Sequence, residues 1–163
     1  MNLIYVGKIV NTHGIKGEVR LLSNFEEKDL VFKKDFKVYV GDERKELIIN
    51  SYRPHKEFDM LTFRGIEDIN QVLKYKGKKV YIDKEDLHLK EDEYLLEDLI
   101  GMNIICDKEV LGVVKDIYEA PQGKLLYITF AKNYYIPYNN YYIKEIDTKK
   151  KEIHAENIKG LIL

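Results

Sequence analysis

Residues 6–20 read VGKIVNTHGIKGEVR, in which two runs rich in β-branched residues are separated by Gly14 and Gly17. β-Branched residues favour strands, and glycine adopts positive φ without steric cost. The pattern therefore predicts two strands joined by a tight glycine corner. Such a corner presents Lys16 to solvent, while Glu18 and Arg20, two residues apart on a strand, share one face.

The polar residues of this corner have two interpretations. In the first, His13, Lys16 and Arg20 form a small contact patch for a partner. In the second, the glycines serve only the geometry of a barrel corner, which is a common use of glycine in strands. The residues alone leave both interpretations open.

Short runs of strand character continue along the chain, each bounded by turn-forming residues. We expect strands at residues 3–10, 18–22, 36–40, 47–52, 60–63, 80–82, 103–106, 111–118, 125–130, 134–137, 141–146 and 152–154. Residues 66–77 differ, because their apolar side chains recur at helical spacing and predict a helix of about ten residues. The spacing of the other runs is typical of barrels or sandwiches, so the predicted fold class is all-β.

The length and one charged segment divide the chain. A length of 163 residues suits one large or two small domains. Residues 83–93 are dominated by charge and lack a core pattern. We therefore predict a first domain at residues 1–83, a linker at 84–93 and a second domain at 94–163.

The charge balance limits the classes of partner. The net charge is −1, so the chain lacks the basic excess of a protein that binds by neutralising many phosphates. Residues 1–87 carry 17 basic and 15 acidic side chains, and residues 88–163 carry 10 and 13. The second half, at −3, is better suited to a basic protein than to bare nucleic acid.

The compartment is predicted from what the sequence lacks. Cys106 is the single cysteine and cannot form an internal disulfide, which agrees with a reducing compartment. No apolar run approaches the roughly 18 residues of a membrane-spanning helix, and no signal pattern opens the chain. We expect a cytoplasmic protein.

Catalytic and metal-binding patterns are missing from the sequence. His13 with Glu18, and His55 with Asp59, are conceivable acid–base pairs. The nucleophile elbow and the glycine-rich nucleotide-binding loops do not occur, and the four histidines are too scattered for a zinc set. We expect no enzymatic activity, no cofactor and no metal.

Two further stretches are candidates for binding. Residues 94–101 read YLLEDLIG. Either Tyr94 and Leu95 are exposed as an anchor for a protein partner, or Leu96, Leu99 and Ile100 cap the open end of the second barrel. The tyrosine-rich residues 134–142 either stack on unpaired bases or form a half-buried barrel wall.

Three parts of the chain together resemble one protein family. Residues 6–20 look like the opening strand and corner of the RimM family of bacterial ribosome-maturation factors. Residues 98–101 (DLIG), 111–116 (LGVVKD) and 136–138 (IPY) resemble the PRC-barrel domain that ends those proteins. The order and spacing match over essentially the whole chain.

The resemblance implies a six-stranded barrel of the translation-factor type, a linker and a PRC barrel. It also implies a non-catalytic role: binding the head of the small ribosomal subunit, through its nineteenth ribosomal protein and nearby rRNA, and promoting assembly and rRNA processing. In the family, an aromatic pair before the DLIG motif matters for this binding. Only Tyr94 of the matching positions keeps an aromatic ring here, and Leu95 and Leu96 depart from the pattern.

The roles expected from the resemblance follow residue by residue. We expect the partner protein to be anchored by Tyr94, Leu95, Asp98 and Leu99, and rRNA or the partner backbone to be contacted by His13, Lys16 and Arg20. We expect a monomer. The alternatives are an RNA-processing enzyme, which rests on the two histidine pairings, and a PRC-type interaction module of another complex.

Overall fold

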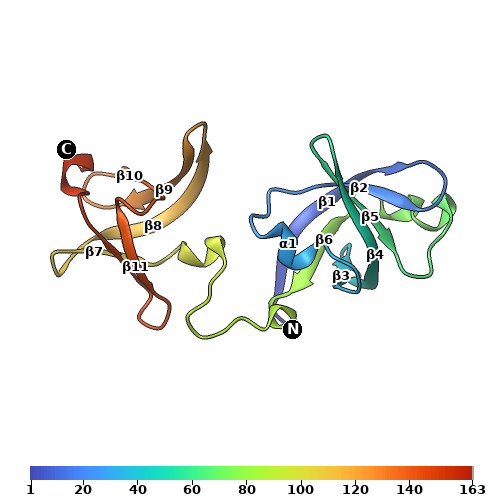
Figure 1. The fold of residues 1–163 in the computed structure, drawn as a ribbon, viewed down its shortest axis with the longest axis horizontal. Coiled ribbons are helices and arrows are strands. Elements are labelled where there is room, and N and C mark those ends of the chain that lie inside the picture. Colours follow the sequence, from blue (N-terminus) through green and yellow to red (C-terminus); the bar gives the residue numbers. More distant parts are fainter. Residues whose placement is uncertain (163) are drawn as a thin grey trace. The chain divides into compact units, whose positions relative to one another are not determined.

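The computed structural model describes residues 1–162, which divide into two compact units: residues 1–88, and the residues from Leu89 onward (Figure 1). Within the described residues, each unit contains six strands and its own hydrophobic core. The prediction of a mainly β protein with two domain-sized units of strands is confirmed. None of the helices within residues 1–162 has the length and apolar character needed to cross a bilayer.

The strands of residues 1–88 close into an antiparallel barrel in the order β1-β2-β5-β4-β3-β6. They are β1 (Leu3–His13), β2 (Glu18–Leu22), β3 (Lys37–Val40), β4 (Lys45–His55), β5 (Phe58–Phe63) and β6 (Lys79–Asp83). All six lie where strands are predicted, and β1 and β4 are longer than expected, at 11 residues each. Closure pairs every strand with two neighbours, so this unit has no edge strand.

Strand β1 closes the ring because it pairs with both β2 and β6. Register shifts between Tyr5 and Gly7, and between Ile9 and Asn11, increase its bend and twist. Gly7 is required at this bend, since a Cβ there would lie 2.9 Å from the carbonyl oxygen of Leu22.

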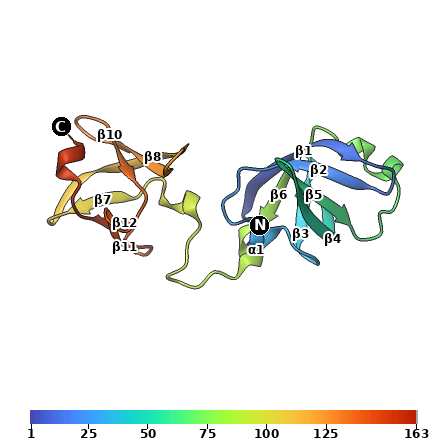
Figure 2. The ribbon, with the colours of Figure 1, turned by 45° about the horizontal axis from the view of Figure 1, so that its top comes forward.

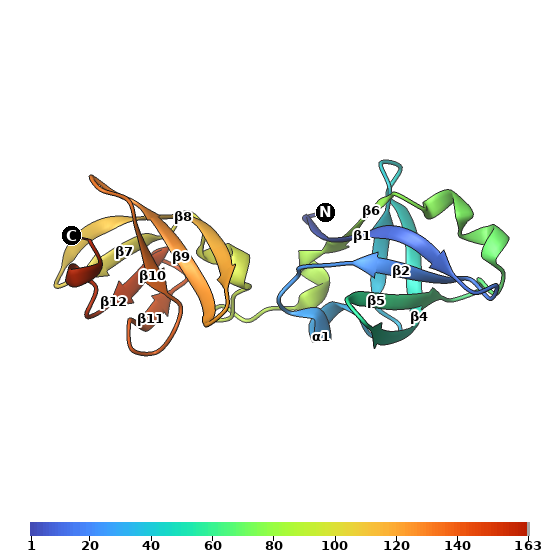
Figure 3. The same cartoon turned by 90° about the horizontal axis from the view of Figure 1, so that it is seen from above.

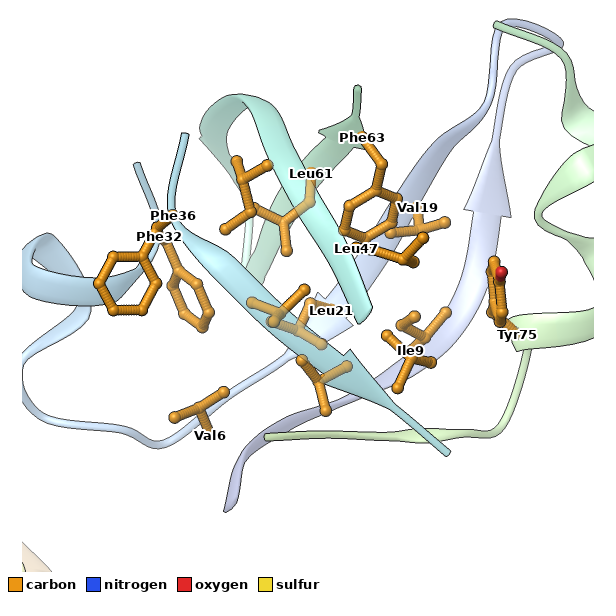
Figure 4. Packing of buried hydrophobic residues seen from close by; sticks show 14 of the residues in the cluster. Val6, Ile9, Val19, Leu21, Phe32, Phe36, Leu47, Leu61, Phe63 and Tyr75 are labelled. Carbon is orange, nitrogen blue, oxygen red and sulfur yellow. The ribbon is translucent and has the colours of Figure 1, made fainter. Parts of the chain in front are cut away.

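The core of the first unit fills the inside of the barrel (Figure 4). Inward-facing side chains such as Leu21 are completely buried. Phe32, which follows the short helix α1 (Lys28–Val31), lies at one end of the packed cluster, and Tyr75 of the 3₁₀ helix η2 (Leu73–Tyr75) lies at the other. Helix α1 is not foreseen in the sequence, because four residues are too few to show helical periodicity.

Residues 66–77 form two short 3₁₀ helices, η1 (Ile69–Gln71) and η2. The prediction of one continuous helix here is wrong, because two backbone donors of this segment bond to β1 and its corner, and others bond to carbonyls three residues earlier, as in 3₁₀ helices. The Ile69 N–H donates to the Ile15 carbonyl, and the Gly77 N–H donates to the Ile9 carbonyl.

The second unit is a six-stranded sheet in the order β10-β9-β8-β7-β12-β11 (Figure 2). Its strands are β7 (Asn103–Cys106), β8 (Glu109–Ala120), β9 (Gly123–Thr129), β10 (Tyr134–Pro137), β11 (Ile143–Asp147) and β12 (Glu152–Ala155). The pair β12 and β7 is parallel, and the other described pairs are antiparallel. Short 3₁₀ helices lie at its two ends in sequence, η4 (Leu96–Leu99) and η5 (Lys159–Leu161).

The core of the second unit takes alternate side chains from its strands. Leu126 and Ile128 of β9, Ile136 of β10 and Ile153 of β12 are completely buried. Tyr134 is also buried, and its hydroxyl donates a hydrogen bond of 2.6 Å to the Leu111 carbonyl. The polar end of the buried ring is therefore satisfied.

The segment predicted as the linker, residues 84–93, begins with the 3₁₀ helix η3 (Lys84–Leu87). The Asp83 carboxylate caps this helix by accepting from the Glu85 N–H at 3.1 Å. Leu87 packs against the core of the first unit. The division between the two compact units falls between His88 and Leu89.

Candidate functional site

The glycine corner between β1 and β2 is held against the segment that precedes η1. Gly14 and Gly17 have φ of +69° and +94°, as the sequence predicts for a tight turn. A Cβ at Gly17 would lie 3.1 Å from Cγ2 of Ile66. Lys16 is exposed at the tip of the corner.

The polar residues that follow this corner lie on the outside of the barrel. On β2, Val19 and Leu21 point into the core, so Glu18 and Arg20 share the outer face, as predicted. Arg20 is opposite Met60 of β5, and Met60 is opposite Arg53 of β4. A row on the outer face therefore crosses β2, β5 and β4, and Met60 in its middle is completely buried.

The two arginines of this row each make a defined set of contacts. Nη2 of Arg20 donates to Nδ1 of His13 at 2.9 Å, and the guanidinium carbon of Arg20 lies 5.6 Å from the centre of the Phe58 ring. The Nε and Nη2 atoms of Arg53 donate to the two carboxylate oxygens of Glu18 at 2.9 and 2.8 Å. Such bidentate pairs hold both partners in a defined geometry.

Positive charge dominates this part of the surface. The His13 and His55 rings lie 5.8 Å apart between centroids. Desolvation lowers the pKa of His55 first, and the positive charges of Arg53, Lys56, His13 and Arg20 lower it further. The hydrogen bond from Arg53 lowers the pKa of Glu18, so this carboxylate stays ionised. We call His13, Arg20, Arg53, His55 and Lys56 the basic face.

The acid–base pairs conceivable from the sequence do not form. Glu18 is bound by Arg53, and His13 accepts its hydrogen bond from Arg20. Asp59 is buried, where it accepts from the Tyr52 hydroxyl at 2.7 Å and pairs with Lys28 at 2.8 Å. No histidine and carboxylate of the two suggested pairs are arranged for proton transfer.

Within residues 1–162, no three histidine, cysteine, aspartate or glutamate side chains are grouped closely enough to hold a metal ion. What the basic face can do chemically is bind an anion such as a phosphate, through guanidinium and imidazole donors.

Sequence reasoning found His13 and Arg20 but missed their neighbours from the β4–β5 hairpin. Arg53, Lys56 and Phe58 join the basic face or border it only because β5 pairs with β2 and β4 pairs with β5. Alternation along β4 and β5 is the one local signal that these residues face outward. The strand order that brings them to His13 and Arg20 is not local.

The second candidate site, around η4, is mostly buried. Leu95 and Leu99 are completely buried, so the expectation that Leu95 is exposed is wrong. Burying a leucine side chain contributes about 2 kcal/mol to folding, which favours the inward orientation. Leu96 packs against the second core, as the capping interpretation predicts, whereas Ile100 remains 46% exposed.

The two polar members of this site have defined partners. The Asp98 carboxylate accepts from the Leu95 N–H at 2.8 Å, and the Asp98 N–H donates to the Leu95 carbonyl at 2.9 Å. Asp98 therefore caps the turn. Tyr94 is half-buried against the second core, with its hydroxyl 3.2 Å from that of Tyr138.

Comparison with known families covers nearly all of the chain. Residues 4–87 match the model of the RimM N-terminal domain, and residues 96–161 match that of the RimM PRC barrel domain. Two relatives are each called ribosome maturation factor RimM. The one from Exiguobacterium sp. is 38% identical, covering 99% of this chain and 98% of its own length. The one from Staphylococcus haemolyticus is 40% identical, covering 98% of both.

One solved structure similar to this chain is a 16S ribosomal RNA processing protein RimM from Pseudomonas aeruginosa. It is 20% identical and covers 94% of this chain and 96% of its own, with a TM-score of 0.44.

Proposed function

The chain belongs to the RimM family of ribosome maturation factors, and from this premise we propose that it binds the head of the small ribosomal subunit. There it contacts the nineteenth small-subunit ribosomal protein and nearby rRNA, and it promotes assembly of the subunit and processing of its rRNA. It does so as a monomer in the cytoplasm. As a member of this family the chain is a maturation factor and not an enzyme.

The basic face is the observation that carries the rRNA part of this proposal. Its arginines are placed by strands β2 and β4, and the Glu18 carboxylate beside them is already neutralised by Arg53. A local positive surface of this kind binds phosphates and so positions the protein on RNA, even when the whole protein is not basic. Lys16, exposed at the corner beside it, extends the charge.

Salt-dependent binding to small-subunit rRNA tests the rRNA contact. Arg20→Gln with Lys56→Gln removes two positive charges, so we expect roughly tenfold weaker binding and a slope of log K against log salt reduced by about 2. The matched control is Lys45→Gln with Lys79→Gln, which removes the same charge from exposed positions on β4 and β6. Equal loss in both double variants would mean that bulk charge, and not this face, binds rRNA.

The protein part of the proposal is supported by the acidic balance of the second unit and by Tyr94. Residues 89–163 carry 10 basic and 13 acidic side chains, which favours a basic partner. Tyr94 and Asp98 are the partly exposed members of the predicted anchor, since Leu95 and Leu99 are completely buried. We propose that those two leucines act by holding Tyr94 and Asp98 in place.

Calorimetric titration with the purified ribosomal protein tests the anchor. Tyr94→Ala should weaken binding roughly tenfold, corresponding to about 1.4 kcal/mol. Tyr94→Phe, which keeps the ring and loses only the hydroxyl near Tyr138, is the control and should bind almost normally. Leu95→Ala should instead lower the stability of the second unit by about 2–5 kcal/mol. Unchanged affinity of Tyr94→Ala would remove Tyr94 from the site.

A further inference from the structure

Strands β8, β9 and β10 are neighbours in the second sheet (Figure 3). Their outer face carries exposed aromatic side chains, where a solvent-facing antiparallel sheet usually carries polar ones. Direct register partners form two adjacent rows across the three strands. The first row is Asp116, Tyr127 and Tyr135, and the second is Tyr118, Leu125 and Pro137. We call these six residues the tyrosine face.

The outward direction of these side chains follows from the residues between them. Leu126 on β9 and Ile136 on β10 are completely buried in the second core, so their neighbours along each strand point the other way. Tyr118 and Tyr135 are 45% and 47% exposed. Exposed aromatic clusters of this kind mark interaction surfaces.

The three rings lie close enough to act on one ligand group. The centroid of Tyr127 lies 4.9 Å from that of Tyr135 and 6.1 Å from that of Tyr118, and the Tyr118 and Tyr135 centroids are 6.3 Å apart. Asn133 donates to the Tyr127 hydroxyl at 3.1 Å and orients this central ring. Burial against its neighbours, and then the Asp116 carboxylate, raise the pKa of Tyr118.

The charge of this face selects the chemistry of its ligand. Asp116 is the only charged residue among the six, and residues 89–163 carry a net charge of −3. A carboxylate beside the rings repels phosphate, so an RNA strand is disfavoured despite the stacking platform. A guanidinium is favoured, because it is attracted to the negative faces of aromatic rings and pairs with carboxylates.

We propose that the tyrosine face binds an arginine-bearing segment of a basic protein, with a guanidinium over the tyrosine rings and paired with Asp116. The inference deepens the proposed function, on which it rests for the presence of basic protein partners. Tyr94 and the residues of the η4 turn are not among the six residues of the tyrosine face.

Titration of the full chain with peptides, followed by the aromatic NMR resonances of the tyrosine rings, tests the proposal. The probes are the decapeptides (Gly-Arg)5 and (Gly-Lys)5 and the oligonucleotide r(U)10. We expect (Gly-Arg)5 to shift the resonances of Tyr118, Tyr127 and Tyr135 saturably, with affinity about threefold or more above that of (Gly-Lys)5. We expect r(U)10 to leave these three resonances unchanged.

Variants distinguish peptide binding at the tyrosine face from non-specific electrostatic binding to the acidic second unit. Tyr135→Ser and Asp116→Asn should each weaken binding of (Gly-Arg)5 about three- to fivefold. Tyr141→Ser is the matched control, since Tyr141 is 61% exposed but lies outside the face, and it should bind normally. Equal affinity for the two peptides, equal loss in all three variants, or ring shifts with r(U)10 alone would each overturn the proposal.

The outcome is distinguishable from failure of the proposed function. The peptide titration requires no ribosomal component, and none of its variants touches the basic face or Tyr94. If the natural chain binds (Gly-Arg)5 but binds neither rRNA nor the ribosomal protein, the proposed function is rejected. The tyrosine face then remains an arginine-binding surface.

Discussion

At the scale of single residues, Gly112 on β8 shows how closely the second sheet is packed. Its φ is +127°, and a Cβ at this position would lie 2.5 Å from Cγ2 of Ile128 and 2.7 Å from the Thr129 carbonyl oxygen. Both neighbours belong to β9, and Ile128 is completely buried. Neither a side chain nor an ordinary backbone conformation fits here.

Gly112→Ala should therefore destabilise the second unit by roughly 2–4 kcal/mol, through backbone strain and overpacking together. Gly160→Ala is the control, because a Cβ at Gly160 meets no atom within 4 Å and its φ is not positive. Urea unfolding followed by circular dichroism measures both changes. A loss of less than about 0.5 kcal/mol in Gly112→Ala would contradict the close packing seen here.

Tyr134 links the stability of the second unit to alkaline pH. Burial raises the pKa of this phenol to about 12, above the ordinary value of 10. Because the folded state holds the proton more tightly than the unfolded state, the stabilisation is complete below pH 10 and is lost as the pH rises towards 12.

Tyr134→Phe should cost about 1–2 kcal/mol at pH 7, because the hydroxyl no longer donates to the Leu111 carbonyl. The variant should then lose less additional stability than the natural chain between pH 10 and 11. Unfolding curves at pH 7, 10 and 11 give the comparison. Parallel losses in the two proteins would mean that Tyr134 ionises freely in the folded state.

At the scale of elements, the outer rows of the two sheets depend on strand pairing more than on any one strand. The basic face requires that β1 pairs with β2, β2 with β5, and β5 with β4. The tyrosine face requires that β9 pairs with both β8 and β10. The η4 turn is different, because its geometry is held locally by Asp98 and the Leu95 backbone.

Substitutions at Asp98 separate capping from partner binding. Asp98→Ala removes the acceptor for the Leu95 N–H and should destabilise the second unit by about 1 kcal/mol. Asp98→Asn keeps an oxygen acceptor and should preserve stability. Chemical denaturation and calorimetry with the ribosomal protein check both. If Asp98→Asn binds weakly at full stability, the carboxylate contacts the partner directly.

At the scale of the whole molecule, each unit has a separate core and the described chain divides after His88. Helix η3 belongs to the first unit, since Leu87 packs on its core and the Lys84 N–H donates to the Asn2 carbonyl at 2.8 Å. We propose that the two units fold independently when they are separated at this point.

A fragment of residues 1–88 should therefore fold, and a fragment of residues 1–83 should be roughly 2 kcal/mol less stable, because it loses the partly buried Leu87 and η3. The fragment from Leu89 onward should also fold alone. Thermal unfolding of the three fragments measures this. Equal stability of fragments 1–88 and 1–83 would place the domain boundary at residue 83.

Local sequence patterns determined the strands of this protein. Strand periodicity predicted the positions of all twelve strands within the described residues, and Gly14 and Gly17 predicted the corner, because these signals come from neighbouring residues. The outward direction of Glu18 and Arg20 followed from the same alternation. The resemblance to the RimM family also needed only short motifs in the correct order.

Tertiary structure alone decided which residues meet and which are buried. Residues 66–77 have helical spacing but lose a continuous helix to hydrogen bonds with β1 and its corner. Leu95 adjoins an exposed segment in sequence, yet the second unit buries it completely. Arg53 reaches Glu18, 35 residues away, only through strand order. Long-range pairing and burial depend on the whole folded chain, so no local pattern contains them.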